Sequence, residues 1–171
     1  MSAADNGSKP GYYERLRRAL RGGVGADVLP IGEALHPLTL LAIGVLVLND
    51  WVLKPRFSPS FITGKLSDIA GLAAAPVVLT ALIGLVLLAA AKLGAGVGPG
   101  LTQRRLVLAV LATGVVFAAI KLSARAASWF TDALGVIRPA TVHLDRTDLA
   151  CLPMLAVAYW IGRDELRRRR R

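Results

Sequence analysis

The sequence predicts an all-α polytopic membrane protein with four transmembrane helices. Three observations support this fold class. The chain has 171 residues of which 54% are hydrophobic, and several long stretches carry no charged side chain. Much of the net charge of +10 lies in the two tails, where basic residues typically hold a membrane protein against anionic headgroups. This composition excludes a disordered chain and an ordinary water-soluble enzyme, and it argues against a nucleic-acid partner.

The predicted transmembrane helices span residues 34–54, 67–92, 105–128 and 145–162. A crossing needs about 20 mostly apolar residues, because the hydrocarbon layer is about 30 Å thick. The second is the clearest, since residues 69–91 contain no charge. The fourth depends on a shorter apolar stretch, which is also compatible with a buried or interfacial segment. The prediction is one helical domain over 34–162, arranged as four single helices or as two parallel hairpins, with basic tails over 1–33 and 163–171.

The N-terminal tail contains Tyr12, Tyr13, Leu16 and Leu20 at helical spacing, with arginines between them. This pattern is typical of an amphipathic helix lying in the headgroup layer. A solvated basic tail is the alternative interpretation.

An even number of crossings places both termini on the same side of the membrane. That side would carry 14 of the 21 Lys and Arg residues, although the connecting loops alone have the opposite bias. The positive-inside rule therefore predicts cytoplasmic termini.

Polar residues gather at the helix ends on the opposite, non-cytoplasmic side. Ionisable groups at membrane depth cost about 2.5–3.5 kcal/mol each on insertion scales, so they normally pair or serve a function. The cytoplasmic halves of the helices are expected to carry almost none. The predicted ligand-binding residues are Asn49, Asp50, Lys54, Lys65, Asp68, Lys121, Arg125 and Asp148.

Spacing suggests roles within this cluster. Lys121 and Arg125 are four residues apart, so we expect them on one helix face, where they could hold a phosphate. Asp68 and Asp148 are the natural anionic neighbours and the candidate catalytic acid–base groups. The alternative is that these charges only snorkel to the interface and pair there.

A short repeat links the second and fourth helices. Residues 67–72 (SDIAGL) and 147–152 (TDLACL) both place a carboxylate directly after a hydroxyl residue. This arrangement favours a hydroxyl N-cap with the carboxylate in the first helical turn. In two parallel hairpins, Asp68 and Asp148 would then meet at the centre of the outer face.

His143, Asp145 and Asp148 form a weak candidate for half of a divalent-metal site, because they offer one nitrogen and two carboxylates within six residues. His143 near a helix start is more often an interfacial residue than a metal ligand. No cofactor is predicted.

Two strings resemble known families. Leu48-Asn49-Asp50, followed by the string TGKLSDIAGL at 63–72, resembles a pattern of uncharacterised bacterial multi-spanning membrane proteins. More weakly, Arg146, Asp148 and Leu149 resemble a late motif of the VanZ-like membrane proteins. These resemblances imply a multi-pass protein of the bacterial inner (cytoplasmic) membrane, and neither supplies a catalytic residue.

Three functions fit the sequence. The first is an accessory or scaffold subunit, or an anionic-lipid-binding protein, whose partners are membrane lipids, other membrane subunits or further copies of the chain. The second is a membrane-embedded enzyme acting on a lipid or a lipid-linked phosphate. The third is a small ion- or proton-coupled transporter, for which a continuous polar pathway is required.

Overall fold

The computed structural model describes residues 12, 29–57, 60–135 and 144–168. Within these residues the chain is helical and contains no strand, so the all-α prediction is confirmed. In the described part of the chain, three helical segments are long and apolar enough to cross a membrane: Pro37–Phe57, Phe61–Lys92 and Gln103–Leu122. The predicted amphipathic helix of the N-terminal tail lies outside the described residues, Tyr12 apart.

The first segment combines α2 (Pro37–Leu48), the π-helix η1 (Asn49–Leu53) and α3 (Lys54–Phe57). It begins at Pro37, whose missing N–H costs nothing at the first helical position. The His36 imidazole caps this end by accepting a hydrogen bond from the Leu38 amide. The π-helix matters for the site, because it contains Asn49, whose side chain is completely buried.

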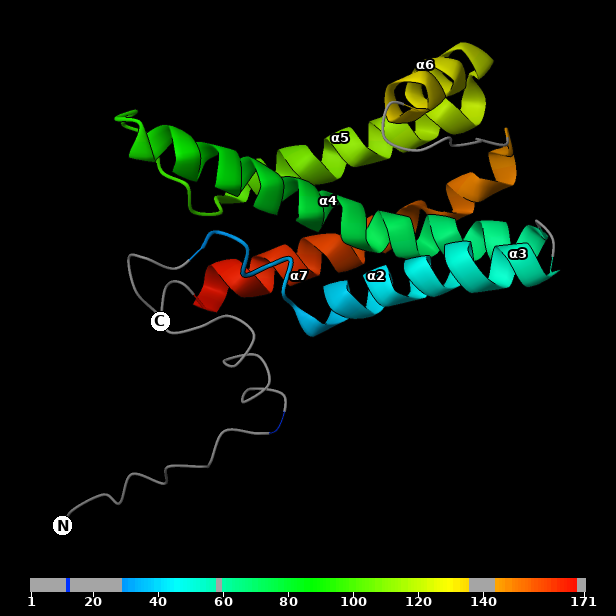
Figure 1. Ribbon diagram of the computed structural model, residues 1–171, viewed down its shortest axis with the longest axis horizontal. Helices are drawn as coiled ribbons and strands as arrows, with labels where there is room; N and C mark the ends of the chain where they lie inside the picture. The colour runs from blue at the N-terminus through cyan, green and yellow to red at the C-terminus, as the bar shows by residue number, and fades with distance from the viewer. Residues whose placement is uncertain (1–11, 13–28, 58–59, 136–143, 169–171) are drawn as a thin grey trace.

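The central element is α4 (Phe61–Lys92), which contacts α2, α5, η2 and α7. Figure 1 shows it running through the middle of the bundle. It begins at Phe61 rather than at residue 67, because Ser60 and Thr63 form a capping box that the prediction overlooked. Its buried face consists mainly of small side chains, which allow the neighbouring helices to approach closely: Ala70, Ala73, Ala74, Val77 and Ala81.

The third helix ends earlier than predicted. Helix α5 (Gln103–Leu122) stops at Ser123, where the backbone is extended. The Ser123 hydroxyl accepts a hydrogen bond from the Ala126 amide and so starts a separate helix, α6 (Ala124–Gly135). Figure 1 shows α6 next to the C-terminal end of α5 and running in a different direction. The predicted continuous helix over 105–128 is therefore wrong at its C-terminal end.

The fourth predicted helix is two elements. A nine-residue 3₁₀-helix, η2 (Arg146–Met154), leads into the α-helix α7 (Leu155–Arg168). Pro153, which lacks an N–H, lies inside η2 close to the change in helix type. The helical path also continues beyond residue 162 to Arg168. This segment is not among the three that are long and apolar enough to count as spans.

Among the described residues, the bundle core has two apolar clusters. Leu72, Phe117 and Cys151 form one, and Val77, Ala158 and Ile161 form the other. Between α5 and α7 the helices meet at Gly162, where an added Cβ would overlap the side chain of Leu106. Close packing therefore favours glycine at this position, because any larger residue would require the Leu106 side chain to move.

Candidate functional site

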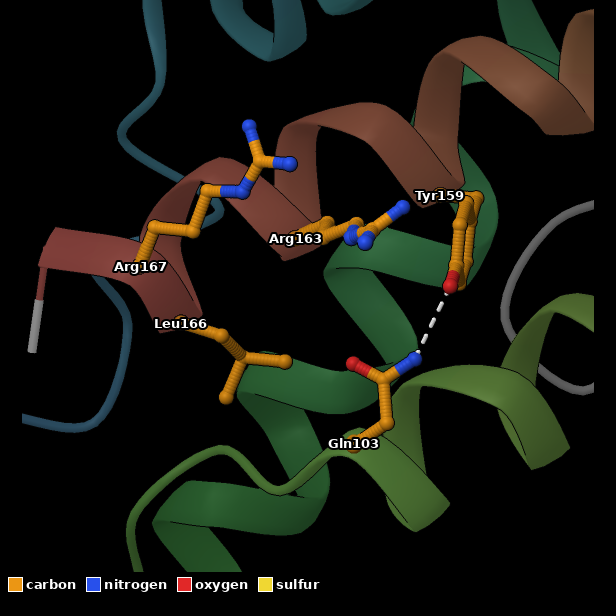
Figure 2. A pocket seen from close by; sticks show the side chains of 5 residues that line it. All are labelled: Gln103, Tyr159, Arg163, Leu166 and Arg167. Carbon is orange, nitrogen blue, oxygen red and sulfur yellow. Dashed lines mark hydrogen bonds between the residues drawn. The ribbon is translucent and has the colours of Figure 1, made fainter. Parts of the chain in front are cut away.

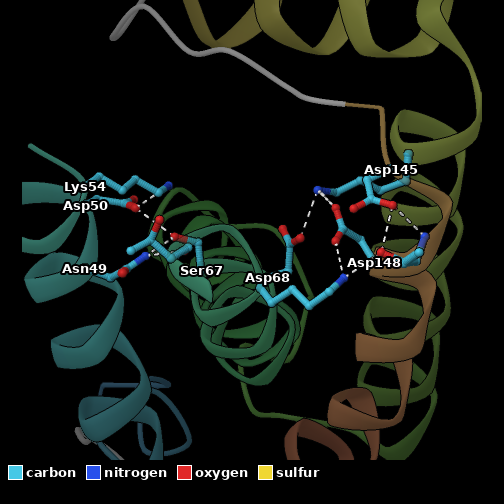
Figure 3. A network of polar contacts seen from close by, with 11 residues as sticks. Asn49, Asp50, Lys54, Ser67, Asp68, Asp145 and Asp148 are labelled. Carbon is cyan, nitrogen blue, oxygen red and sulfur yellow. Dashed lines mark hydrogen bonds and ion pairs between the residues drawn. The ribbon is translucent and has the colours of Figure 1, made fainter. Parts of the chain in front are cut away.

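Three helical segments bring two lysines and two aspartates together at one end of the bundle. The Lys121 ammonium of α5 lies 2.9 Å from the Asp68 carboxylate of α4 and 2.6 Å from the Asp148 carboxylate of η2. Lys65, also on α4, lies 2.8 Å from the second oxygen of Asp148. Figure 3 shows both aspartates turned toward the gap between α4 and η2. We call Lys65, Asp68, Lys121 and Asp148 the Asp–Lys network.

The Asp–Lys network is largely removed from solvent. Lys121 is 8% exposed and Asp148 is 6% exposed. Removing such charges from water is costly, and the cost is recovered only when each charge has a close, hydrogen-bonded counterion. The network meets this condition, because its two ammonium groups are matched by two carboxylates. The ammonium groups also lie near the aromatic rings of their own helices, 4.4 Å from Phe61 for Lys65 and 5.5 Å from Phe117 for Lys121.

A second group of contacts joins η1 to α4 at the same end. The Asn49 amide donates to the Thr63 carbonyl at 2.6 Å and to the Ser67 hydroxyl at 2.7 Å. Ser67 in turn donates to Asp50 at 2.8 Å, and Asp50 pairs with Lys54 at 2.7 Å. Figure 3 shows this group on the α2–α3 side of α4, away from Asp148. We call Asn49, Asp50, Lys54 and Ser67 the Asn49 network.

The structure therefore brings together seven of the eight predicted ligand-binding residues, in two adjoining networks. The exception is Arg125. It was expected on one helix face with Lys121, but α5 ends at Leu122 and Arg125 lies on α6. Its side chain is exposed. The prediction of a shared face is wrong because spacing of four residues implies proximity only within one uninterrupted helix.

The predicted meeting of Asp68 and Asp148 is seen, but the predicted hydroxyl N-caps at Ser67 and Thr147 are not. Both carboxylates bind the same ammonium group, that of Lys121. Ser67, however, is not an N-cap, because α4 already begins at Phe61. The cap of η2 is Asp145 rather than Thr147. The repeated sequence thus marks two helices that approach each other, not two equivalent helix starts.

The candidate metal ligands have other roles where they are described. His143 lies outside the described residues. Asp145 accepts hydrogen bonds from the hydroxyl and the amide of Thr147, at 2.7 and 2.8 Å. These bonds hold the pKa of Asp145 below its ordinary value, because they stabilise the carboxylate. In the part of the chain that the structure describes, no three His, Cys, Asp or Glu side chains form a group able to hold a metal ion.

The opposite end of the bundle contains ionisable residues that the sequence analysis did not anticipate. Glu33, His36 and Glu165 are buried there, and the His36 imidazole lies 3.6 Å from Asp164. The expectation that this half would carry almost no ionisable groups is wrong. In the sequence these residues fall in the predicted basic tails or at the edge of a predicted span, and only the packing of residues 30–36 against α7 reveals their burial. The sequence offered one signal of this burial, which is the acidic residue Glu165 among the arginines near the end of α7.

Comparisons with protein-family models, with curated proteins and with solved structures find no match to this chain.

The chemistry available at the Asp–Lys network follows from its pairing. A phosphate-binding site requires cations that are free to exchange one anion for another. Here Lys121 already binds two carboxylates and Lys65 binds one, together with the Thr147 hydroxyl. Cys151, one turn from Asp148 in η2, is buried in an apolar cluster. The arrangement is suited to joining helices inside a membrane.

Proposed function

We propose that this protein is an integral membrane scaffold or accessory subunit, in which the Asp–Lys network joins the helices near the outer face of the membrane. The observation that supports this role most directly is the double contact of Lys121 with Asp68 and Asp148. A buried cation that bridges two helices contributes to assembly only while both partners remain bound to it. The function proposed is therefore structural.

The proposed topology has four crossings, with η2 and α7 together forming the fourth. A 3₁₀-helix rises about 2.0 Å and an α-helix about 1.5 Å per residue, so the two elements extend over about 39 Å, more than the hydrocarbon thickness of about 30 Å. Both termini then lie on one side. The excess of Lys and Arg on that side supports cytoplasmic termini in a bacterial inner membrane. The contact of both aspartates with Lys121 supports two parallel hairpins.

An outward-facing apolar surface supports the role as a subunit. Large hydrophobic side chains are exposed along the candidate spans, among them Val86, Leu108 and Val115. In a membrane these side chains face lipid or the helices of a partner. Other subunits and further copies of this chain are the partners we propose.

The alternative functions receive less support. An enzyme acting on a lipid-linked phosphate would use Asp68 or Asp148 as acid–base groups, yet both are bound to lysine. A transporter requires a polar path between the two ends of the bundle. The apolar clusters around Leu72 and Val77 lie between them.

The double variant D68N/K121M separates the scaffold from the enzyme. It removes one carboxylate and one ammonium and leaves Lys65 paired with Asp148. For a scaffold, we expect this charge-balanced variant to assemble with its partners at the stoichiometry of the wild type, because the remaining Lys65–Asp148 pair still joins α4 to η2 and no buried charge is left unpaired. Mass spectrometry of particles extracted in native lipid measures the stoichiometry. A wild-type particle containing a single polypeptide would contradict the subunit role. Loss of a cellular phenotype in a normally assembled D68N/K121M particle would favour the enzyme.

The topology has its own test. The native Cys151 is buried, so cysteines introduced by S60C and G98C report the two ends of the bundle. A membrane-impermeant thiol reagent added to intact cells should label position 60 and not position 98. The reverse pattern would invert the proposed orientation.

A further inference from the structure

A basic pocket lies at the end of the bundle opposite the Asp–Lys network. It encloses about 290 Å³ and is lined by Gln103, Tyr159, Arg163, Leu166 and Arg167. Figure 2 shows Arg163 beside Tyr159 and Arg167 one turn further along α7, with Leu166 and Gln103 bordering the hollow below them. Two helices far apart in sequence, α5 and α7, therefore form the basic pocket.

The two arginines of the basic pocket are available to a ligand. They are four residues apart on α7, so both lie on one helix face. Both are exposed, and among the described residues neither forms an ion pair. The acidic residues beside them have other neighbours: Asp164 lies near His36 and Arg168, and Glu165 approaches Gly32.

The basic pocket also contains neutral hydrogen-bond donors, which could bind an anion together with the two arginines. The Gln103 amide donates to the Tyr159 hydroxyl oxygen at 2.9 Å, which leaves the hydroxyl hydrogen of Tyr159 free to donate. Gln103 is also the first residue of α5, so the positive end of a helix dipole borders the basic pocket. Guanidinium groups with nearby neutral donors are the groups that proteins use to bind phosphate.

The position of the basic pocket in the bundle indicates which kind of phosphate-containing ligand it could bind. Gln103 begins one candidate span, so the pocket lies at the level where hydrocarbon gives way to headgroups. Leu166 supplies an apolar wall beside the arginines. Basic pockets between transmembrane helices on the cytoplasmic side bind phospholipid headgroups in other proteins. We infer that the basic pocket binds the phosphate group of an anionic phospholipid.

This inference rests on the membrane insertion proposed above and is independent of the scaffold role. The test measures binding of dioleoylphosphatidylglycerol to the full chain in detergent by native mass spectrometry. The test variant is R163A/R167A. The control variant is K92A/R104A, which removes two exposed positive charges at the same end of the bundle but outside the pocket.

We expect the wild type to retain one phosphatidylglycerol, and R163A/R167A to bind it about tenfold or more weakly, because charge-assisted hydrogen bonds are lost. The control should stay within about twofold of the wild type, since it leaves every pocket donor in place. Circular dichroism should show that both variants remain folded. R163K/R167K should recover part of the affinity, because lysine restores charge but not the planar guanidinium.

Three outcomes would overturn the inference. The first is unchanged lipid binding in R163A/R167A. The second is an equal loss in K92A/R104A, which would mean that net charge alone attracts the lipid. The third is displacement of the lipid by an equal concentration of inorganic phosphate, which would identify free phosphate as the ligand. Because subunit assembly is measured separately, failure of this test leaves the scaffold proposal standing.

Discussion

The two ends of the helix bundle differ in whether their positively charged side chains form ion pairs. At one end Lys65 and Lys121 are matched by Asp68 and Asp148 at distances of 2.6–2.9 Å. At the other end Arg163 and Arg167 line a hollow and form no ion pair among the described residues. A buried cation with bound counterions makes the fold depend on its partners, because removing one of them leaves an uncompensated charge, whereas an unpaired cation beside a cavity can bind a ligand. This difference is the basis for proposing a structural role for one end and a binding role for the other.

The largest effect should come from breaking the paired end with K121M. This variant leaves the partly buried Asp68 carboxylate without a counterion, and we expect it to lower the free energy of unfolding by about 3–5 kcal/mol. Reversible unfolding in mixed micelles measures the change. The matched variant D68N/K121M keeps one lysine paired with one aspartate and should regain most of the loss. Wild-type stability of K121M would show that the pairing is not structural.

The next effect concerns the packing that holds the basic pocket together. In G162A the new methyl group would overlap Leu106, which is completely buried and has little room to move. We expect a loss of about 1–3 kcal/mol in the free energy of unfolding, together with weaker contact between Gln103 and Tyr159. The control G64A meets no atom within 4 Å. Equal stability of the two variants would argue against tight packing of α5 on α7.

A smaller effect should distinguish exposed from buried pairs at the same end. Lys54 and Asp50 form an i,i+4 pair in which both side chains are 36% exposed. We expect K54A to lower the free energy of unfolding by only about 0.3–0.5 kcal/mol, because exposed pairs are screened and entropically costly. A loss as large as that of K121M would mean that the Asn49 network depends on this ion pair.

The smallest effect on stability should come from the basic end. Arg163 and Arg167 are exposed, so R163A/R167A should change the free energy of unfolding by no more than about 0.5 kcal/mol. The same unfolding measurement provides the test. A large loss of unfolding free energy would show that these arginines stabilise the fold rather than serve a binding site, and the contrast between the two ends would disappear.

Part of this arrangement could be predicted from the sequence. Residues 69–91 form a charge-free stretch within one helix, and seven of the eight expected ligand-binding residues lie in the two adjoining networks. The errors fell at helix boundaries. Ser60 extends α4 toward the N-terminus through a capping box with Thr63, and a side-chain hydrogen bond of Ser123 starts α6 directly after the end of α5. Such local side-chain caps do not change the spacing of the apolar residues, so the apolar pattern does not reveal them.

The helical, membrane-type character of the chain is determined by its sequence, because long apolar stretches can satisfy their backbone hydrogen bonds in lipid only as helices or closed barrels. The pairing of the charges was decided by the tertiary structure. Whether Lys121 binds Asp68, Asp148 or a phosphate depends on how three separate elements approach within a few ångströms. The same is true of Glu33 and the basic pocket, because burial and enclosure are properties of packed neighbours rather than of any one segment.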